Sequence, residues 1–359
     1  MGKDLHGGGN TLKMESLTSR ERVLTTFEFG EPDRVPKWLG ASPEFKNKAM
    51  MELNLPTEEE LMQCFGDDFR RVIAPYLPEG HEGPADSPFG IPRAGIGYGM
   101  ATDNPLREAG MDDISKYAWP DPKHIDLSNI RSDAEKHRGQ YAILGGDWSP
   151  FWHDLTDLLG MENMFIKMYT EPELVERMLE KIMDYYLEVN TRIFEEAADL
   201  IDIFFIGNDF GSNTGPLLDV SLFDRFIVPQ LERLTGLGHQ YGHKVMLHCC
   251  GGFRELIPSM IDAGLDGLHA IQPSCRGMDL QELKKEFGDR IVFNGCIDSN
   301  FVLIRGTPEY VRQATERTID IMKPGGGFIA GASHDYLLEE TPVENVHAMF
   351  DTIQSYGKY

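Results

Sequence analysis

The sequence is short of basic residues. Lysine and arginine together number 34, against 58 aspartate and glutamate residues, so the formal charge at neutral pH is 34 − 58 = −24. Such an acidic field repels the phosphates of nucleic acids and the head groups of anionic membranes. We therefore expect neither nucleic acid nor a membrane surface as a partner.

Cysteine and long apolar runs are scarce as well. Five cysteines in 359 residues do not form a disulfide framework, and no run approaches the roughly 20 apolar residues that span a bilayer. The opening stretch M-G-K-D-L-H-G-G-G-N lacks the apolar centre of a secretion signal. These absences indicate a protein of the reducing cytoplasm.

Three common catalytic signatures are also missing. The chain has no G-x-x-x-x-G-K-[ST] phosphate loop, no G-x-S-x-G nucleophile elbow and no H-E-x-x-H zinc helix. Residues 1–13 are Gly-rich, polar and aperiodic, and we expect them to form a mobile arm. No break in composition divides residues 14–359, so we expect one domain there.

Short apolar runs alternate with amphipathic segments along that domain. The expected strands lie at residues 35–40, 72–76, 142–147, 201–207, 245–249, 267–271, 291–295 and 327–331. This alternation predicts a parallel α/β fold, and eight strands favour a closed (β/α)8 TIM barrel over an open sheet. Segment 77–140 is rich in proline, glycine and aspartate, which indicates an excursion near the barrel mouth.

Catalytic residues of such a barrel lie where the strands end and the following loops begin. The titratable side chains at the expected strand ends are His153, Asp209, His248, Cys249, Cys250, Cys275, Cys296, Asp298, His334 and Asp335.

The segment V-M-L-H-C-C-G-G-F (245–253) places two adjacent cysteines at one strand end. Side chains alternate between the two faces of a strand, so His248 and Cys250 share one face and Cys249 points to the other. A disulfide between adjacent cysteines needs strained geometry. One imidazole and one thiolate can supply two zinc ligands, whereas the alternative is a hydrogen-bonded histidine beside a buried, inert thiol.

A catalytic zinc site needs a third protein ligand from another strand end. We expect His334, in G-A-S-H-D, to be that ligand. Cys296, Cys275, His269 and Asp335 are the alternatives, and Asp335 could instead orient a ligand. A loop histidine that caps the next helix is an equally good interpretation of His334.

Two further strand ends offer groups for a substrate. Asp209, in G-N-D-F-G, could bind a substrate group or act as acid or base, although a turn or cap aspartate fits the local sequence as well. In D-W-S-P-F-W-H-D we expect Trp148, Trp152 and His153 to line a pocket. Aromatic packing of the barrel mouth is the alternative for the two tryptophans.

Four stretches, taken in order, resemble one known family. They are R-E-R-V-L-T-T-F-E-F-G-E-P-D-R-V-P, G-N-D-F-G-S-N-T-G-P-L-L-D-V-S-L-F-D-R-F-I-V-P, H-C-C-G, and G-G-G-F-I-A-G-A-S-H-D followed by E-T-P-V-E-N-V. The chain resembles the uroporphyrinogen decarboxylase superfamily from about residue 19 to residue 355. That resemblance implies a (β/α)8 barrel.

The superfamily contains two chemistries. Uroporphyrinogen decarboxylases need no cofactor and carry an arginine-rich segment after the first strand, but here that region is W-L-G-A-S-P-E-F-K-N-K, without arginine. The other branch resembles methylcobalamin:coenzyme M methyltransferases, which bind zinc through an H-x-C motif and a later cysteine. His248 and Cys250 match H-x-C, while Ser333 and His334 stand where that branch has its cysteine.

The resemblance therefore implies a zinc-dependent methyltransferase that acts with a corrinoid (cobalamin) protein on a small methylated compound or a thiol. In this hypothesis His248, Cys250 and His334 hold the zinc, and Asp209 positions the substrate. The alternatives are a metal-free decarboxylase with Asp209 as the key carboxylate, and a non-catalytic barrel that binds a tetrapyrrole or corrinoid. The sequence leaves the methyl donor, the acceptor and the oligomeric state open, a homodimer included.

Overall fold

A computed structural model describes residues 16–78, 87–94 and 99–359. The predicted arm at residues 1–13 lies outside these ranges, and the boundary at residue 14 stays a prediction. Eight parallel strands form one sheet in the order β1-β12-β11-β10-β9-β6-β5-β2. The strands are β1 (Lys37–Trp38), β2 (Phe69–Arg71), β5 (Ala142–Gly145), β6 (Ile203–Gly207), β9 (Lys244–His248), β10 (Gly267–Ile271), β11 (Val292–Ile297) and β12 (Phe328–Ala332).

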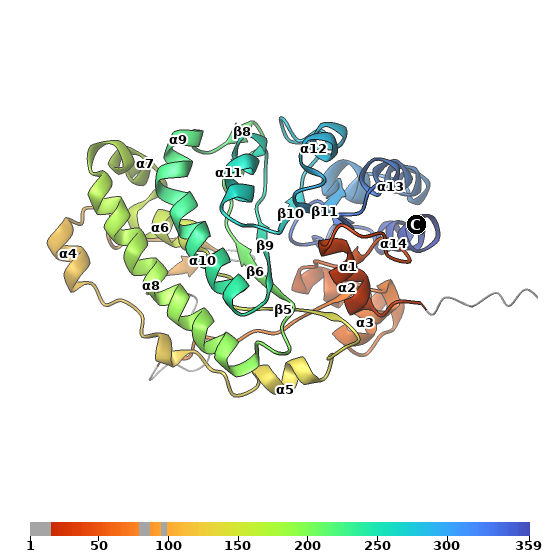
Figure 1. Ribbon diagram of the computed structural model, residues 1–359, viewed down its shortest axis with the longest axis horizontal. Helices are drawn as coiled ribbons and strands as arrows, with labels where there is room; N and C mark the ends of the chain where they lie inside the picture. Colours follow the sequence, from red (N-terminus) through yellow and green to blue (C-terminus); the bar gives the residue numbers. More distant parts are fainter. Residues whose placement is uncertain (1–15, 79–86, 95–98) are drawn as a thin grey trace, which may run out of the picture.

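The two ends of this sheet meet, so the fold is the predicted (β/α)8 barrel. The backbone N–H of Asp68, just before β2, donates to the carbonyl of Lys37 in β1 over 3.1 Å. In Figure 1 the N-terminal helices, in red and orange, lie beside the C-terminal helices, in blue, which completes the ring.

Seven of the eight expected strands agree with the structure to within two residues. The prediction of a strand at 72–76 is wrong, because the strand is β2, three residues earlier. Its sequence F-R-R contains no apolar run. Arg70 is nevertheless buried there, since its guanidinium donates twice to the Glu59 carboxylate and stacks 3.7 Å from the centre of the Tyr141 ring.

Helices surround the strands. They are α1 (Ser19–Phe27), α2 (Pro43–Leu53), α3 (Glu58–Phe65), α4 (Met111–Lys116), α5 (Ile130–Glu135), α6 (Phe151–Leu159), α7 (Met161–Thr170), α8 (Pro172–Ala197), α9 (Val220–Leu222), α10 (Val228–Gln240), α11 (Ile257–Asp262), α12 (Leu280–Phe287), α13 (Pro308–Met322) and α14 (Val343–Tyr356). Short 3-10 or π turns are η1 (Pro122–His124), η2 (Phe223–Ile227), η3 (Arg254–Leu256) and η4 (Ser299–Ile304). None of the helices in the described ranges combines the length and apolar character that crossing a bilayer requires.

Local signals explain where α1 begins. The Thr18 hydroxyl accepts from the Glu21 backbone N–H, and the Glu21 carboxylate accepts from the Thr18 N–H, which together form a capping box. The remaining small elements are two hairpins. They are β3 (Arg93–Ala94) with β4 (Met100–Ala101), and β7 (Gly211–Ser212) with β8 (Gly215–Pro216).

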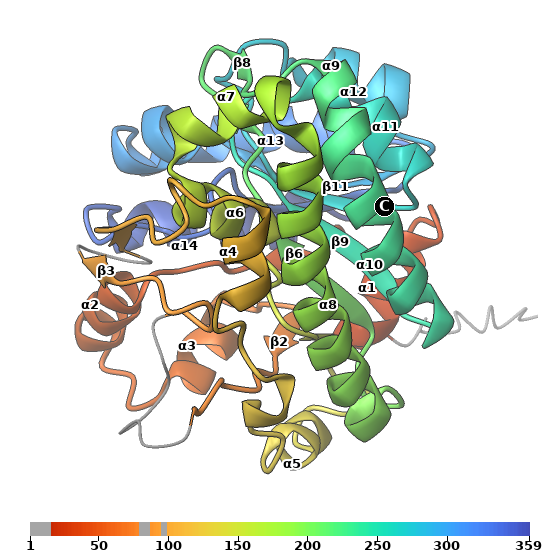
Figure 2. The ribbon, with the colours of Figure 1, turned by 90° about the vertical axis from the view of Figure 1, so that its left-hand side faces the viewer.

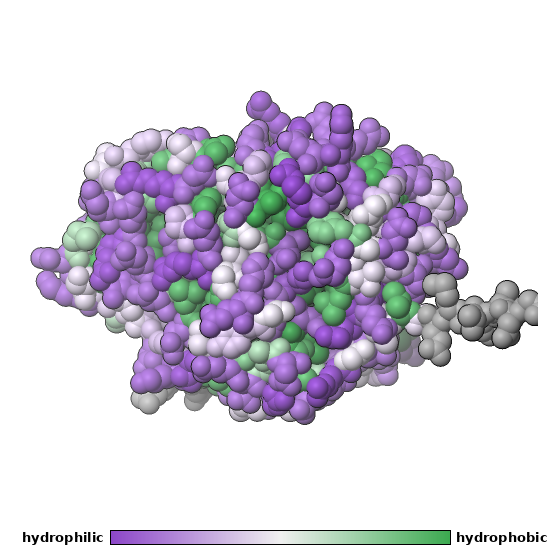
Figure 3. Space-filling model, in the orientation of Figure 1, coloured by the Kyte–Doolittle hydropathy of each residue, from purple (hydrophilic) through white to green (hydrophobic). Residues whose placement is uncertain are grey.

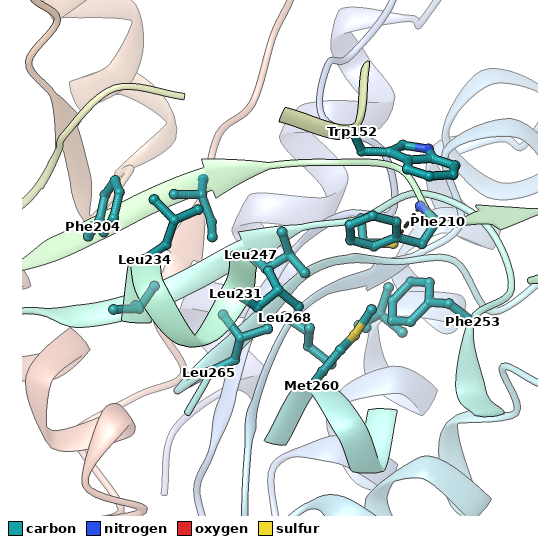
Figure 4. Close-up of a cluster of buried hydrophobic side chains, with 14 of the residues drawn as sticks. Trp152, Phe204, Phe210, Leu231, Leu234, Leu247, Phe253, Met260, Leu265 and Leu268 are labelled. Atoms are coloured by element: carbon teal, nitrogen blue, oxygen red, sulfur yellow. Dashed lines mark hydrogen bonds between the residues drawn. The ribbon is translucent and has the colours of Figure 1, made fainter. Parts of the chain in front are cut away.

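Strand alternation divides the core into two layers. Side chains such as Trp38, Phe205 and Met246 fill the lumen. The residues next to them in sequence face the helices, as Figure 4 shows for Phe204 and Leu247 packed among residues of the outer helices. Because these side chains fill the lumen, the open end of the barrel is the mouth formed by the carboxyl ends of the strands.

The described residues of segment 77–140 lie only partly at that mouth. The hairpin β3–β4 reaches the mouth cavity through Arg93 and Gly99. The rest, α4, η1 and α5, packs along the outside of α8 down to the opposite end of the barrel, as Figure 2 shows. Most of this segment is thus the connection that carries the chain from β2 back to the start of β5.

Candidate functional site

The H-C-C segment lies at the carboxyl end of β9, with its side chains distributed as strand alternation predicts. The Sγ atom of Cys250 lies 3.3 Å from Nε2 of His248. Cys249 is fully buried against the helices, where its sulfur accepts from the backbone N–H of Phe210. All five cysteines are free thiols, so His248 and Cys250 form a pair and Cys249 belongs to the core.

Asp209, in the loop after β6, completes a group of three donor atoms. Its Oδ1 atom accepts from the Cys250 backbone N–H over 2.7 Å and lies 3.5 Å from Nε2 of His248. The ligand atoms of Asp209, His248 and Cys250 all lie within 4.8 Å of one another. An imidazole nitrogen, a sulfur and a carboxylate oxygen are donors that zinc accepts.

The other nitrogen of His248 faces a second group. Its Nδ1 atom lies 3.0 Å from Nδ1 of His269, and the ligand atoms of His248, His269 and Asp335 also lie within 4.8 Å of one another. Burial, with the charge of His248, lowers the pKa of His269, which favours a neutral His269 ring as the acceptor in this hydrogen bond. This hydrogen bond leaves Nε2 of His248 directed at Cys250 and Asp209.

Electrostatics favours a proton in the Asp209, His248 and Cys250 group when no cation is bound. Burial would lower the pKa of His248, but Cys250, Asp335 and Asp209 outweigh it and raise that pKa well above its usual value. Burial would raise the pKa of Asp209, yet His248 holds it below its usual range. Burial raises the pKa of the Cys250 thiol. A bound cation would therefore displace protons from the histidine and the thiol.

His334 does not join either group among the described residues. Its Nδ1 atom accepts from the Tyr336 backbone N–H over 3.2 Å, and the ring lines a separate cavity of about 420 Å³ that also contains Cys275 and Asp298. Successive side chains after β12 point in opposite directions. Asp335 rather than His334 therefore faces His248. The role of His334 as a zinc ligand stays a prediction.

The cysteine alternatives are also placed apart from His248. Cys275 donates weakly to Oε1 of Gln272 over 3.4 Å in the cavity of His334. Cys296 is buried in β11, where burial raises the pKa of its thiol. His269 and Asp335 are the two alternatives that the fold does bring to His248.

Trp148 and His153 line a second cavity, of about 410 Å³, together with Asp209 and His248. The Trp148 ring lies 5.4 Å from the His248 ring, measured between centres, and Nε2 of His153 accepts from the Asp209 backbone N–H over 3.2 Å. These two residues therefore lie where the sequence predicted.

The prediction for Trp152 needs correction. Helix α6 begins at Phe151, and its turn directs Trp152 away from the mouth and into the core. The indole is fully buried beside Phe165 and Phe210. Trp152 therefore packs the barrel wall and does not line the cavity.

Several residues of the mouth escaped the sequence reasoning. Asp154, on α6, is buried and accepts a hydrogen bond from the hydroxyl of Tyr186, on α8. Burial raises the pKa of Asp154 to about 7. Arg93 pairs with Asp157 at the rim, and Arg71 extends from the end of β2 over Trp148. Only the folded chain brings these residues together, although Asp154 lies within the D-W-S-P-F-W-H-D segment itself.

Two glycines allow the loops after β6 and β9 to touch. A Cβ atom added at Gly211 would lie 2.6 Å from the carbonyl oxygen of Cys250, and one at Gly251 would lie 2.4 Å from the carbonyl carbon of Gly211. Gly251 also has a φ of +89°, which other residues rarely adopt. This backbone contact holds Asp209 against Cys250.

A parallel (β/α)8 barrel with nitrogen, oxygen and sulfur donors at the carboxyl ends of its strands has the arrangement of a TIM-barrel enzyme. The family model for uroporphyrinogen decarboxylase (URO-D) matches residues 97–356. The chain belongs to the uroporphyrinogen decarboxylase family.

Relatives of both chemistries are similar to the chain. The methylcobamide:CoM methyltransferase MtbA of Methanosarcina acetivorans is 21% identical over 64% of this chain and 63% of its own length. The uroporphyrinogen decarboxylase of Methylococcus capsulatus is 27% identical over 73% of each chain. The match to MtbA spans less than two thirds of that methyltransferase. The resemblance to the methyltransferase branch is confirmed, at low identity.

A solved structure shares the fold. A methyltransferase from Methanosarcina mazei superimposes with a TM-score of 0.66, covering 95% of this chain and 99% of that one, at 18% identity. At this identity the likeness supports the barrel architecture alone.

Proposed function

We propose that the protein is a zinc-dependent methyltransferase that acts with a corrinoid protein on a small methylated compound or a thiol. The observation that carries the proposal is the group at the barrel mouth, in which the ligand atoms of Asp209, His248 and Cys250 lie within 4.8 Å of one another. Two methylcobamide:CoM methyltransferases among the relatives, MtbA and MtaA, support it.

The residues present fit zinc by their chemistry. His248 and Cys250 would hold the metal through Nε2 and Sγ, the two atoms that already lie 3.3 Å apart. Zinc would supply Lewis acidity toward a thiol or a methylated substrate at neutral pH. His269 orients the His248 ring through the Nδ1–Nδ1 hydrogen bond, as outer partners of zinc-binding histidines do.

The third ligand is the open point within this proposal. The Asp209 carboxylate already lies close enough to His248 and Cys250 to be that ligand. If Asp209 binds the metal, His153 and Trp148 remain to line the substrate cavity. His334 would have to leave its hydrogen bond to Tyr336 and turn toward the lumen. If His334 makes that change, Asp209 is free to position the substrate through its carboxylate.

Metal analysis tests the proposal. Protein purified anaerobically without added metal should contain close to one zinc per chain, and His248→Ala should contain almost none. Asp209→Asn and His334→Ala, compared in parallel, identify the third ligand, because the variant that loses zinc names it. Wild-type protein without near-stoichiometric metal would refute the zinc-dependent reading.

Activity with methylcobalamin and a thiol then tests the reaction. Loss of the methylcobalamin absorption spectrum in the presence of protein and thiol should depend on Cys250 and on zinc. Corrinoid binding with no turnover of any methyl donor or thiol would instead favour a non-catalytic binding barrel.

The second candidate is decarboxylation of uroporphyrinogen or a smaller acid, with Asp209 as the key carboxylate. The decarboxylase from Methylococcus capsulatus favours it, because it is more similar to this chain than the methyltransferase MtbA. The loop after β1 still contains no arginine. Formation of coproporphyrinogen from uroporphyrinogen by the metal-free protein would establish this function.

A further inference from the structure

Asp154 and Tyr186 form a buried pair in the wall of the cavity that Asp209 and His248 also line. Asp154 lies on α6 and Tyr186 on α8, and 2% of each residue is exposed. The Tyr186 hydroxyl donates to Oδ2 of Asp154. Asp154 belongs to neither of the donor groups that the described residues form around His248. The cavity therefore contains a carboxyl group that the proposed zinc site does not use.

The surroundings of Asp154 differ from those of Asp209. The Asp209 carboxylate lies 3.5 Å from Nε2 of His248. Within the described part of the chain Asp154 forms no ion pair, and the partner of its side chain is the Tyr186 hydroxyl. Burial raises the pKa of this hydroxyl and of the neighbouring Tyr185 hydroxyl, so both are neutral. A buried carboxyl with a neutral partner is most stable when it carries its proton.

The charged groups around Asp154 act in opposite directions. Burial raises the pKa of Asp154 to about 7, and the carboxylates of Asp157 and Asp147 contribute to this increase. The hydrogen bond from Tyr186 and the charge of Arg93 oppose it, but Arg93 forms its own ion pair with Asp157. Asp154 thus keeps a proton at a pH at which a carboxyl in water has lost it. Enzymes that need an acid beside an ionised carboxylate use such a difference in environment.

A proton donor suits one direction of methyl transfer. When a methyl ether gives its methyl group to a cobalt(I) corrinoid, the corrinoid supplies the electron pair of the new bond. The electron pair of the broken C–O bond stays on the oxygen, which must then take up one proton. Methylation of a thiol releases a proton instead, and a methylated ammonium group leaves as a neutral amine without one. A general acid in the cavity therefore serves an ether.

We propose that Asp154 is the general acid of this cavity, and that the methyl donor is a small ether whose leaving oxygen takes the proton of the Asp154 carboxyl. The inference rests on the proposed function for the methyl transfer itself. The O–H bond of Asp154 breaks and leaves its electrons on the carboxylate, while the ether oxygen forms the new O–H bond. Tyr186 orients the carboxyl and stabilises the resulting anion through its hydrogen bond. The Trp148 ring, in the same cavity, contacts the apolar part of the ether.

Infrared difference spectroscopy tests the proton and its contact with an ether without turnover. The probes are anisole and ethylbenzene, which have nearly the same shape and differ in the ether oxygen. Wild-type protein should show the C=O band of a buried protonated carboxyl, which fades as the pH rises through about 7 and is absent from Asp154→Asn. Anisole should shift this band, because the carboxyl then donates to the ether oxygen, and ethylbenzene should leave it in place.

Asp67→Asn is the matched control. Asp67 is also buried, and burial raises its pKa to about 8, but it lines the separate cavity of Trp38 and Arg71. Its replacement should remove a different C=O band and leave the anisole shift unchanged. An anisole shift that survives in Asp154→Asn, or no shift in the wild type, overturns the proposal.

Single-turnover methyl transfer to cob(I)alamin tests the reaction. The donors are anisole, whose oxygen needs a proton, and phenyltrimethylammonium, whose amine leaves without one. Asp154→Asn should slow transfer from anisole by about a hundredfold or more and leave transfer from phenyltrimethylammonium unchanged. This comparison also excludes a loss that merely reflects poor folding. Equal slowing of both donors, or transfer from phenyltrimethylammonium alone in the wild type, overturns the proposal.

The pH profile tests the role of Tyr186 in the same assay. In the wild type the rate with anisole should fall as the pH rises above about 7, because Asp154 is then ionised. Tyr186→Phe should move this fall to higher pH, since the hydrogen bond from Tyr186 lowers the pKa of Asp154. A Tyr186→Phe profile that falls at the same pH as the wild type would contradict the positioning role of Tyr186.

The zinc content separates this proposal from the proposed function. Asp154→Asn should keep the zinc content of the wild type, because Asp154 lies outside the donor groups. Wild-type protein without zinc but with an anisole shift that depends on Asp154 would refute the zinc chemistry alone. Zinc-loaded protein in which Asp154→Asn slows neither donor would refute the general acid alone.

Discussion

At the scale of single residues, His248 presents its two ring nitrogens to different groups of donors. Nε2 faces Cys250 and Asp209, while Nδ1 forms a hydrogen bond with Nδ1 of His269. A histidine that must offer one lone pair to a metal needs its other nitrogen held in the protonated form. The pair of buried histidines supplies that condition without a carboxylate in direct contact.

The two adjacent cysteines should behave differently when each is replaced. Cys250→Ser should lose zinc, because its sulfur lies against His248, whereas Cys249→Ser should keep zinc and lose only some stability from the buried sulfur. Metal analysis of the two purified variants measures the difference. Loss of zinc from both, or from neither, would contradict the assignment.

Asp154 should make stability depend on pH. Its pKa rises from 3.8 to about 7 because it is buried. A carboxyl with a raised folded-state pKa favours folding while it is protonated, and its ionisation between pH 4 and about pH 7 opposes folding. Wild-type protein should therefore lose about 2–4 kcal/mol of unfolding free energy over that range relative to Asp154→Asn.

Urea denaturation at a series of pH values measures this difference. Asp154→Asn keeps an acceptor for the Tyr186 hydroxyl, so it separates ionisation from the loss of the hydrogen bond. Parallel pH curves for the two proteins would show that Asp154 does not titrate in this window.

At the scale of elements, a buried ionic cluster closes the barrel between β1 and β2. The Asp68 carboxylate accepts from Arg22 over 2.7 Å, from Arg34 over 2.8 and 3.0 Å, and from the Lys37 backbone N–H over 2.7 Å. Arg22 also donates to Asp33. The stretch R-E-R-V-L-T-T-F-E-F-G-E-P-D-R-V-P thus supplies the two arginines that bind the carboxylate just before the second strand.

Removal of the Asp68 carboxylate should lower the free energy of unfolding. Asp68→Asn leaves two largely buried guanidinium groups without their shared anion, and such changes cost about 3–5 kcal/mol. Guanidinium chloride denaturation measures the loss, with Asp289→Asn, an exposed aspartate in the turn before β11, as the control. A loss no larger than that of the control would mean that water or another acid replaces the carboxylate.

The elements also show what the sequence can predict. Apolar runs locate seven strands, because parallel strands are buried on both faces, but they miss β2, whose F-R-R is stabilised by pairing and stacking that arise only in the fold. Alternation along β9 correctly pairs His248 with Cys250.

Strand alternation makes no prediction for residues beyond a regular strand. His334 and Asp335 are adjacent in a loop, and no periodicity tells which of them faces His248. Trp152 was expected at the mouth but belongs to a helix that begins one residue earlier. Arg71 and Tyr186 come from segments remote from the motif residues, so no local pattern connects them to the site.

At the scale of the whole molecule, the surface agrees with the acidic composition. The face drawn in Figure 3 is mostly hydrophilic, and its apolar patches are small and scattered. Arg71 and Arg93 nevertheless lie at the barrel mouth, although the chain as a whole carries 24 more acidic than basic residues.

Zinc should stabilise the entire chain, because a ligand that binds only the folded state raises the unfolding temperature. At a free zinc concentration 100 times the dissociation constant, the gain is about 2.7 kcal/mol, which corresponds to about 3 °C for a chain of this length. Differential scanning calorimetry with zinc and with a chelator measures the shift. Cys250→Ser should show none, and an equal shift in that variant would place the metal elsewhere.

The contact between Gly211 and Gly251 limits how this site can be redesigned. The two glycines hold the loops after β6 and β9 so close together that a methyl group at either position meets backbone atoms. In a combinatorial library aimed at new substrates, varying these two positions would displace Asp209 and Cys250 together and fill the library with inactive members. Diversity introduced at residues 71, 93, 148 and 153 would instead change the cavity walls while the donor group keeps its place.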